Sequence, residues 1–174
     1  MKWIVLYSQT GSEIANLSKH LNRKPDLILT NNKNEQTYSS DLINLDTPIT
    51  IGDHRDLMDI IRSHLPSEII VTLHGYLKII PQDVCEKYSI YNGHPGLITT
   101  YPELKGHNPQ IRTWNGDYKE IGSVVHKVTD IVDDGEVLSY YSCSNRAESL
   151  DDLYDTLKQT SFQSWINFFN MVDI

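Results

Sequence analysis

The fold of this chain is decided by Trp3-Ile4-Val5-Leu6-Tyr7 and by the Gly11-Ser12 turn that follows it. The continuous apolar run predicts a strand buried on both faces, which is typical of a parallel sheet. Beyond the turn, apolar residues recur at helical spacing from Ile14 to Leu21, and Pro25 ends the helix that they predict. A buried strand, a turn and a helix in this order indicate a parallel α/β sheet.

Strand and helix signals then alternate along the chain. Strands are predicted at Asp26–Thr30, Glu68–Leu73 and Tyr88–Asn92, and helices at His54–Leu65, directly after Pro81, and at Asn108–Trp114. Two segments lack this periodicity and are predicted to be loops: Asn31–Ser40 and Pro95–Lys105. We therefore expect a Rossmann-like, mostly parallel sheet with helices on both faces.

The last third of the chain changes character. Gly122–Thr129 and Glu136–Cys143 are rich in β-forming residues and predict an antiparallel hairpin closed by a tight acidic turn. Ser149 is predicted to cap a final amphipathic helix that reaches Phe169. Residues 1–174 contain no linker-like stretch, so we expect a single domain.

Composition narrows the class of protein. The net charge of −8 argues against a nucleic-acid partner that would be bound through a basic footprint. No apolar run approaches the roughly 20 residues of a membrane span, and the first apolar run is too short for a signal peptide. Cys85 and Cys143 lie in no paired motif, which favours reduced thiols. We expect a cytoplasmic protein with a small-molecule ligand; the sequence does not indicate its oligomeric state.

Candidate catalytic residues lie in two stretches, Tyr91-Asn92-Gly93-His94-Pro95-Gly96 and Asp133-Asp134-Gly135. Alternate residues of a strand point to one side, so the side chains of Asn92 and His94 can reach the same reacting atom. Ligands of open α/β sheets bind at the carboxyl ends of the strands, where this pair is placed. A carboxylate from the second stretch could hold the imidazole in one protonation state.

Other motifs carry less information. The Gly11-Ser12 turn could bind an anion at the helix N-terminus, although the Glu13 carboxylate would repel a phosphate if it faced it. A tight turn with an N-cap is the simpler explanation of the motif. Neither a dinucleotide fingerprint nor a Walker loop is present, the histidines lack metal-ligand spacing, and no serine lies in a nucleophile elbow. His126 should face the core with Val124 and Val128, where it could brace the Asp133 loop or serve only packing.

At these residues the sequence resembles the folate-dependent formyltransferases. The stretch from Tyr91 to Ile98 is similar to the Asn-x-His-Pro-Ser-Leu-Leu signature of that family, and Val132-Asp-Asp-Gly-Glu-Val-Leu138 continues the match in the right order. The stretches Val5–Ser12 and Leu73–Ile80 resemble the opening loop and the folate-side strand of the glycinamide ribonucleotide enzymes. The likeness extends over nearly the whole chain.

The resemblance implies a catalytic triad of Asn92, His94 and Asp133, with Asp133 preferred to Asp134, and His126 in support. It implies 10-formyltetrahydrofolate as the donor and no metal. The pterin pocket would be lined by Leu77, Lys78, Ile79, Ile80, Ile131, Val132, Asp134 and Gly135. The amine acceptor would lie against Gly11, Ser12, Glu13, Lys105 and Gly106.

The resemblance does not determine which amine is the acceptor. Glu13 stands where the glycinamide enzymes usually carry Asn, and Tyr101–Pro109 is more similar to the sugar-nucleotide and methionyl-tRNA members. The implied acceptor is a small primary amine, possibly phosphorylated and glycinamide-ribonucleotide-like, with an amino-sugar nucleotide as the alternative. A hydrolase of 10-formyltetrahydrofolate and a catalytically silent folate-binding module are the lesser alternatives.

Overall fold

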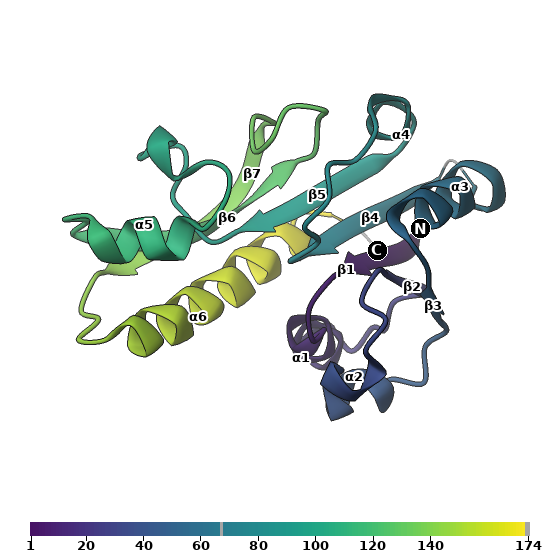
Figure 1. The fold of residues 1–174 in the computed structure, drawn as a ribbon, viewed down its shortest axis with the longest axis horizontal. Helices are drawn as coiled ribbons and strands as arrows, with labels where there is room; N and C mark the ends of the chain where they lie inside the picture. The colour runs from purple at the N-terminus through teal and green to yellow at the C-terminus, as the bar shows by residue number, and fades with distance from the viewer. Residues whose placement is uncertain (67, 173–174) are drawn as a thin grey trace. The chain divides into compact units, whose positions relative to one another are not determined.

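The apolar run at the start of the chain forms β1 (Lys2–Tyr7), the central strand of a parallel sheet (Figure 1). β1 pairs with β2 (Leu27–Thr30) on one side and with β4 (Ile69–His74) on the other. The outer strands are β3 (Ile49–Ile51), beside β2, and β5 (Ser89–His94), beside β4. The order in this part of the chain is therefore β3-β2-β1-β4-β5, with every pair parallel.

The helices of this sheet form two pairs. α1 (Ser12–Leu21) packs with α2 (Ser40–Ile43), and α3 (His54–His64) packs with α4 (Gln82–Lys87). The strand order runs in one direction from β1 to β3 and in the other from β4 to β5, so right-handed crossovers place the two pairs on opposite faces (Figure 1). The order reverses between β1 and β4, which makes the carboxyl ends of these two strands the expected ligand site of the sheet.

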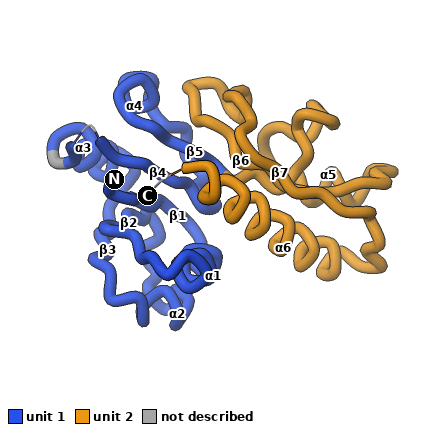
Figure 2. The backbone as a smooth tube through the Cα atoms, turned by 180° about the vertical axis from the view of Figure 1, so that it is seen from behind, with its two compact units in different colours: residues 1–92, 174 blue, residues 93–173 orange. Residues whose placement is uncertain are grey.

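The computed structural model describes residues 1–66 and 68–172, and it divides the chain into two units, residues 1–92 and residues 93–173 (Figure 2). The second unit contains an antiparallel pair, β6 (Glu120–Lys127) and β7 (Val137–Ser144), against which α6 (Leu150–Phe169) packs. A short helix, α5 (Pro109–Asn115), and a 3-10 turn, η2 (Pro102–Leu104), precede the pair.

The Rossmann-like α/β class that the sequence predicts is confirmed, and so are several boundaries. The hydroxyl of Ser149 accepts a hydrogen bond of 3.1 Å from the backbone N–H of Asp152, so it caps α6 as expected. Pro81 stands immediately before α4, and His126 is buried together with Val124 and Val128.

Five details differ from the predictions. The short strand β3 was not foreseen, and the polar segment 31–40 contains a 3-10 turn, η1 (Glu35–Thr37), because short elements leave little periodicity to detect. β5 continues to His94 rather than ending at Asn92. The connection between β6 and β7 spans residues 128–136 and is not a tight turn. The segment 95–105 is not structureless, because it contains η2 and the buried residues Leu97, Ile98 and Leu104.

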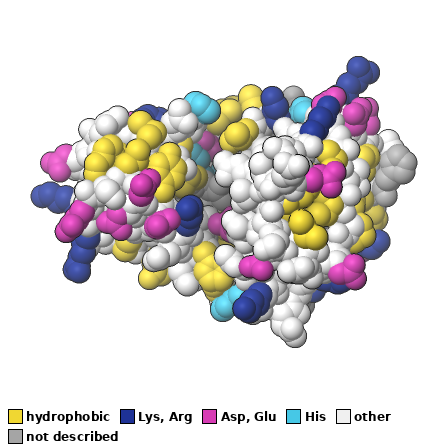
Figure 3. Space-filling model, turned by 60° about the horizontal axis from the view of Figure 1, so that its bottom comes forward, with side chains coloured by type: hydrophobic (Ala, Val, Ile, Leu, Met, Phe, Trp, Pro, Cys, Tyr) yellow, Lys and Arg dark blue, Asp and Glu magenta, His cyan; other side chains and the backbone are white. Residues whose placement is uncertain are grey.

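Two further properties of the structure bear on function. Within the described residues, no helix is both long enough and apolar enough to cross a bilayer. On the face drawn in Figure 3, Lys and Arg side chains are dispersed among Asp and Glu side chains rather than gathered into one basic patch.

Candidate active site

Strand β5 carries the amide and the imidazole that the sequence singles out. Asn92 and His94 are two residues apart in this extended strand, so their side chains lie on the same side of it. Asn92 is half-buried and stands in register with Leu73 of β4, whereas His94 is only 4% exposed. Pro95 cannot donate to a ladder and ends the strand directly after His94.

Asp133 lies between two imidazoles in the second unit. Its Oδ2 atom is 3.2 Å from Nδ1 of His94, and its Oδ1 atom is 3.2 Å from Nε2 of His126. The backbone N–H of Gly106 donates a hydrogen bond of 2.8 Å to Oδ2. All three side chains are buried, so the described part of this unit holds a carboxylate and two imidazoles largely shielded from water.

The other nitrogen of each imidazole faces a backbone carbonyl. Nε2 of His94 lies 2.9 Å from the carbonyl oxygen of Leu104, and Nδ1 of His126 lies 2.9 Å from that of Lys127. A ring nitrogen that faces a carbonyl must carry the proton, because a carbonyl oxygen only accepts. Asp133 therefore receives a hydrogen bond from an imidazole only when both nitrogens of that ring carry protons.

Asp133 is held ionised by its neighbours. Burial alone would raise the pKa of this carboxyl, but the imidazoles of His126 and His94, together with the Gly106 amide, lower it well below its ordinary range. Its backbone has a φ of 51°, in the left-handed region that Asp and Asn tolerate better than most residues. The site thus contains a permanent negative charge in a fixed position.

The loop of Asp133 is packed tightly against the end of β6 at Gly135. A Cβ atom at this position would lie 1.8 Å from the carbonyl oxygen of Lys127, so no side chain fits without moving backbone. We expect Gly135→Ala to lower the free energy of unfolding by about 1–3 kcal/mol or more, and to reduce activity by displacing Asp133. Chemical denaturation and the transfer assay measure the two effects.

Gly52→Ala is the matched control for this substitution. Its Cβ would approach side-chain atoms of Leu57 and Asp56 no closer than 3.3 Å, and the glycine stands in the first unit. Equal and small effects of Gly135→Ala and Gly52→Ala would contradict the claim that tight packing at Gly135 stabilises the protein and positions Asp133.

The residues predicted for the acceptor divide between the units. Gly11 adopts a φ of 73° and stands directly before α1, which begins with Ser12 and Glu13 at the carboxyl end of β1. Within this unit the Glu13 carboxylate lies 2.7 Å from Nδ1 of His74, the last residue of β4. In the second unit, Lys105 pairs with Asp134 at 2.6 Å, beside the contact between Gly106 and Asp133.

The residues predicted for the folate pocket include several apolar side chains that face solvent. In the first unit, Leu77 and Ile79 are 66% and 62% exposed, whereas Ile80 is buried. In the second unit, Ile131 and Val132 are 61% and 48% exposed. The backbone N–H of Leu77 donates a hydrogen bond of 3.2 Å to the hydroxyl of Ser8, so the loops that follow β4 and β1 are tied together at the point where the strand order reverses.

Three contacts that position the candidate site residues could not be predicted from the sequence. His74 anchors Glu13, the carbonyl of Leu104 holds His94, and Arg112 holds that carbonyl. A strand-end histidine such as His74 gives a weak signal at most. Backbone carbonyls and their partners give none, because every residue has a carbonyl.

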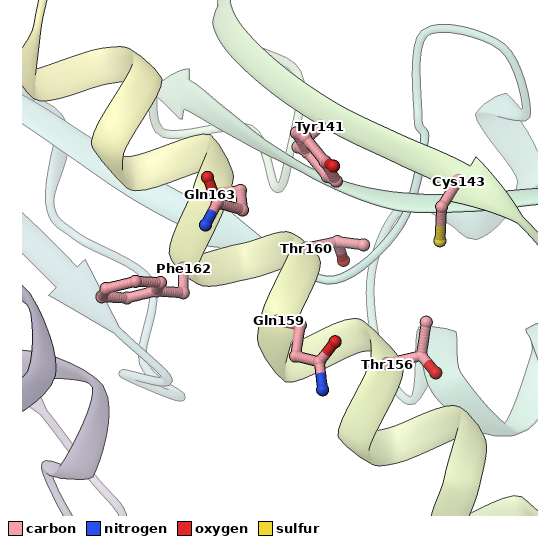
Figure 4. A pocket seen from close by; sticks show the side chains of 7 residues that line it. All are labelled: Tyr141, Cys143, Thr156, Gln159, Thr160, Phe162 and Gln163. Atoms are coloured by element: carbon pink, nitrogen blue, oxygen red, sulfur yellow. The ribbon is translucent and has the colours of Figure 1, made fainter.

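A pocket of about 450 Å³ lies elsewhere in the second unit, over α6 and β7 (Figure 4). Its lining consists of Tyr141, Cys143, Thr156, Gln159, Thr160, Phe162 and Gln163. None of these residues belongs to the group around Asp133, and the set offers neither a carboxylate nor an imidazole. The Asp133 group, and not this pocket, is therefore the candidate active site. Within residues 1–66 and 68–172, no cluster of three or more His, Cys, Asp or Glu side chains is arranged to hold a metal ion.

Comparison with known proteins supports this fold. The chain resembles phosphoribosylglycinamide formyltransferase from Campylobacter jejuni, with a TM-score of 0.81, 21% identity and 97% of each chain covered. It resembles the enzyme of the same name from Streptococcus pneumoniae, with a TM-score of 0.81, 18% identity and 98% of each chain covered.

A third similar structure is a formyltetrahydrofolate deformylase from Pseudomonas syringae, with a TM-score of 0.77, 17% identity and coverage of 95% of this chain and 59% of that one. Comparison with curated sequences gives no match. The sequence model described as formyl transferase matches residues 53–167, which is more than half of the chain and includes Asn92, His94 and Asp133. This chain is therefore a member of the formyl transferase family.

Proposed function

We propose that this protein transfers a formyl group from 10-formyltetrahydrofolate to a primary amine of a small acceptor. The observation that carries the proposal is the buried group of His94, Asp133 and His126, with the Asn92 amide two residues before His94 on the same strand. Membership of the formyl transferase family supports the reaction type.

The proposed reaction forms one bond and breaks another. The amine nitrogen attacks the formyl carbon, and the bond between that carbon and N10 of the folate breaks. The amine loses a proton and N10 gains one. The intermediate is tetrahedral and carries an oxyanion, for which one well-placed donor is commonly worth about 2.7–4 kcal/mol.

Asn92 is proposed as the direct donor to the oxyanion, because an amide donates without titrating. The sequence analysis placed the side chains of Asn92 and His94 within reach of the same reacting atom. In the structure, however, the His94 ring nitrogens face Asp133 and the Leu104 carbonyl. The proposal therefore gives His94 a different role, in which its positive charge stabilises the oxyanion in a water-poor site. Asp133 keeps that charge in place and helps the proton leave the amine, directly or through a water.

The donor site is proposed to be lined by the exposed apolar side chains of the two loops. Leu77 and Ile79 follow β4, and Ile131 and Val132 precede Asp133. A flat pteridine binds to apolar side chains through its faces and to backbone groups through its edge, which is the usual composition of a small-molecule site. Lys78, Ile80, Asp134 and Gly135 are proposed to complete the lining.

The acceptor is proposed to be glycinamide-ribonucleotide-like, in line with the named activity of two similar structures, and to lie against the loops of Gly11–Glu13 and Lys105–Gly106. The amino-sugar nucleotide is kept as the alternative. In the first loop, the Glu13 carboxylate would repel a negatively charged group of the acceptor and would not repel an uncharged one. Two unit charges 4 Å apart interact by about 1 kcal/mol in water and about 4 kcal/mol near a protein surface.

We expect Glu13→Asn to lower the KM of a phosphorylated amine by about tenfold relative to that of its unphosphorylated counterpart, because 1.4 kcal/mol of repulsion corresponds to a factor of ten. Steady-state kinetics with the two acceptors measures this ratio. Asp41→Asn removes an equal charge from the first turn of α2 and should leave the ratio unchanged. An unchanged ratio in Glu13→Asn as well would mean that no phosphate binds at this loop.

Water is the competing acceptor, because one similar structure is named as a formyltetrahydrofolate deformylase. The test is to incubate the protein with 10-formyltetrahydrofolate alone and then with candidate amines, while release of tetrahydrofolate is followed. Release that requires an amine supports the proposal, whereas equal release without amine supports the hydrolase. If reduced folate neither binds nor turns over, the protein is a catalytically silent member of the family.

A further inference from the structure

Arg112 of α5 binds the backbone of a segment that precedes its own helix. Its guanidinium donates hydrogen bonds to three consecutive carbonyl oxygens: to Glu103, to Leu104 at 3.1 Å and to Lys105 at 2.8 Å. Within the described residues, Arg112 takes part in no ion pair. The cation is therefore used to hold neutral carbonyl groups, with charge-assisted hydrogen bonds that are about twice as strong as neutral ones.

The same backbone segment touches two of the three side chains of the candidate active site in this unit, His94 and Asp133. We call residues 103–106 the clamp segment. Its Leu104 carbonyl accepts the hydrogen bond from His94 Nε2, and its Gly106 N–H donates to Asp133 Oδ2. A carbonyl oxygen has two lone pairs, so Leu104 can serve Arg112 and His94 together.

The clamp segment is held by the packing of Leu104 and by the hydrogen bonds from Arg112. The Leu104 side chain is 2% exposed and packs with Leu97, Ile98 and Val124. The backbone of a 3-10 turn has few internal hydrogen bonds, and here three consecutive carbonyls accept from one side chain. Without the guanidinium, the Glu103 and Lys105 carbonyls would be free to turn toward water, and His94 alone would hold the Leu104 carbonyl.

We propose that Arg112 is a positioning residue for the formyl transfer proposed above, and the inference rests on that function. By fixing the Leu104 carbonyl, Arg112 keeps the His94 ring in one orientation with its proton on Nε2. By fixing the segment as far as Gly106, it keeps the amide on Asp133. The hydrogen bonds of the Arg112 guanidinium go to backbone carbonyls and not to His94 or Asp133, so Arg112 acts through the clamp segment.

The test replaces Arg112 with Met, which keeps the length of the stem and removes every donor. We expect kcat to fall by about 10- to 100-fold, as small displacements of catalytic groups do. The KM for 10-formyltetrahydrofolate should change much less. Unchanged or raised kcat in Arg112→Met would overturn the inference.

A second readout does not depend on turnover. We expect the ring N–H proton of His94, observed by NMR in ¹⁵N-histidine-labelled wild-type protein without substrate, to be lost or shifted in Arg112→Met. If wild-type protein transfers no formyl group, the proposed function fails while this readout still tests the contact. An unchanged His94 resonance would overturn the role of Arg112 even if wild-type protein is active.

Two variants complete the design. Arg62→Met removes another arginine, which pairs with Asp83 and Asp59 on the surface of the first unit, and should leave kcat and the His94 resonance unchanged. Arg112→Lys keeps the charge but serves fewer carbonyls at once, so it should recover only part of kcat. Should Arg112→Met fail to fold, Arg112→Lys decides: wild-type kcat and an unshifted His94 resonance would overturn the inference, and an intermediate kcat with a shifted resonance would support it.

Discussion

His94→Ala is expected to lower kcat for formyl transfer by about 10²- to 10⁴-fold, the range for loss of a group that acts on the reacting charge or proton. The substitution removes the imidazole that faces Asp133 and leaves the Leu104 carbonyl without its imidazole donor. The donor should still bind, because the apolar side chains proposed for its pocket are untouched. Single-turnover kinetics together with a folate-binding titration separates the two effects.

His20→Ala is the matched control for this variant. His20 is an exposed histidine in the last turn of α1, so its loss should change neither binding nor turnover. Circular dichroism and thermal melting should show that His94→Ala retains the fold. A folded His94→Ala protein with nearly wild-type kcat would remove His94 from the mechanism.

Asp133→Asn is expected to reduce both activity and stability. Removing one partner of a buried ion pair commonly costs roughly 3–5 kcal/mol, because the other partner is left uncompensated. Asn tolerates the left-handed backbone at this position, so the effect reports the lost charge and not backbone strain. We expect kcat to fall by at least about 10²-fold, since the carboxylate that faces the His94 imidazole is gone.

The stability effect of Asp133→Asn should depend on pH in a defined direction. The pKa of Asp133 is lowered in the folded protein relative to the unfolded chain, whose carboxyl titrates near about 3.9. The stabilisation by this carboxylate is therefore fully present above about pH 5, and it is lost as the pH falls through and below the unfolded pKa. Urea unfolding at neutral and acidic pH should show a large difference between wild type and variant at neutral pH that shrinks on acidification.

Asp117→Asn controls for the loss of a carboxylate as such. Asp117 is exposed and lies before β6, so its substitution should change stability little at either pH. A difference between wild type and Asp133→Asn that stayed constant from neutral to acidic pH would contradict the account of a buried, ionised Asp133.

Strong local patterns are what made the fold predictable from the sequence. The continuous apolar run of β1 and the helical spacing after it are enough to predict a parallel sheet, because few other structures bury such a run on both faces. The pair Asn92 and His94 could be placed at the end of a strand because Pro95 cannot continue one. Asp133 followed from a resemblance of motifs and not from periodicity.

The arrangement around the imidazole could not be predicted in the same way. The clamp segment binds through backbone groups, which leave no pattern in the side-chain types. Arg112 lies on α5, and its position in a helix does not indicate that its side chain binds backbone carbonyls. The pairing of Glu13 with His74 joins residues 61 positions apart, so no local pattern indicates it. The short strand β3 was missed because its three residues leave too little periodicity to detect.

The fate of the formyl carbon decides the central proposal. Wild-type protein is supplied with 10-formyltetrahydrofolate that carries ¹³C in the formyl group, together with a phosphorylated and an unphosphorylated amine. NMR and mass spectrometry then follow the label. We expect the label to appear as an N-formyl group on an amine, with release of one tetrahydrofolate for each product formed and no such product from His94→Ala. Label that appears only as free formate, or that stays on the folate with every amine, would contradict the account.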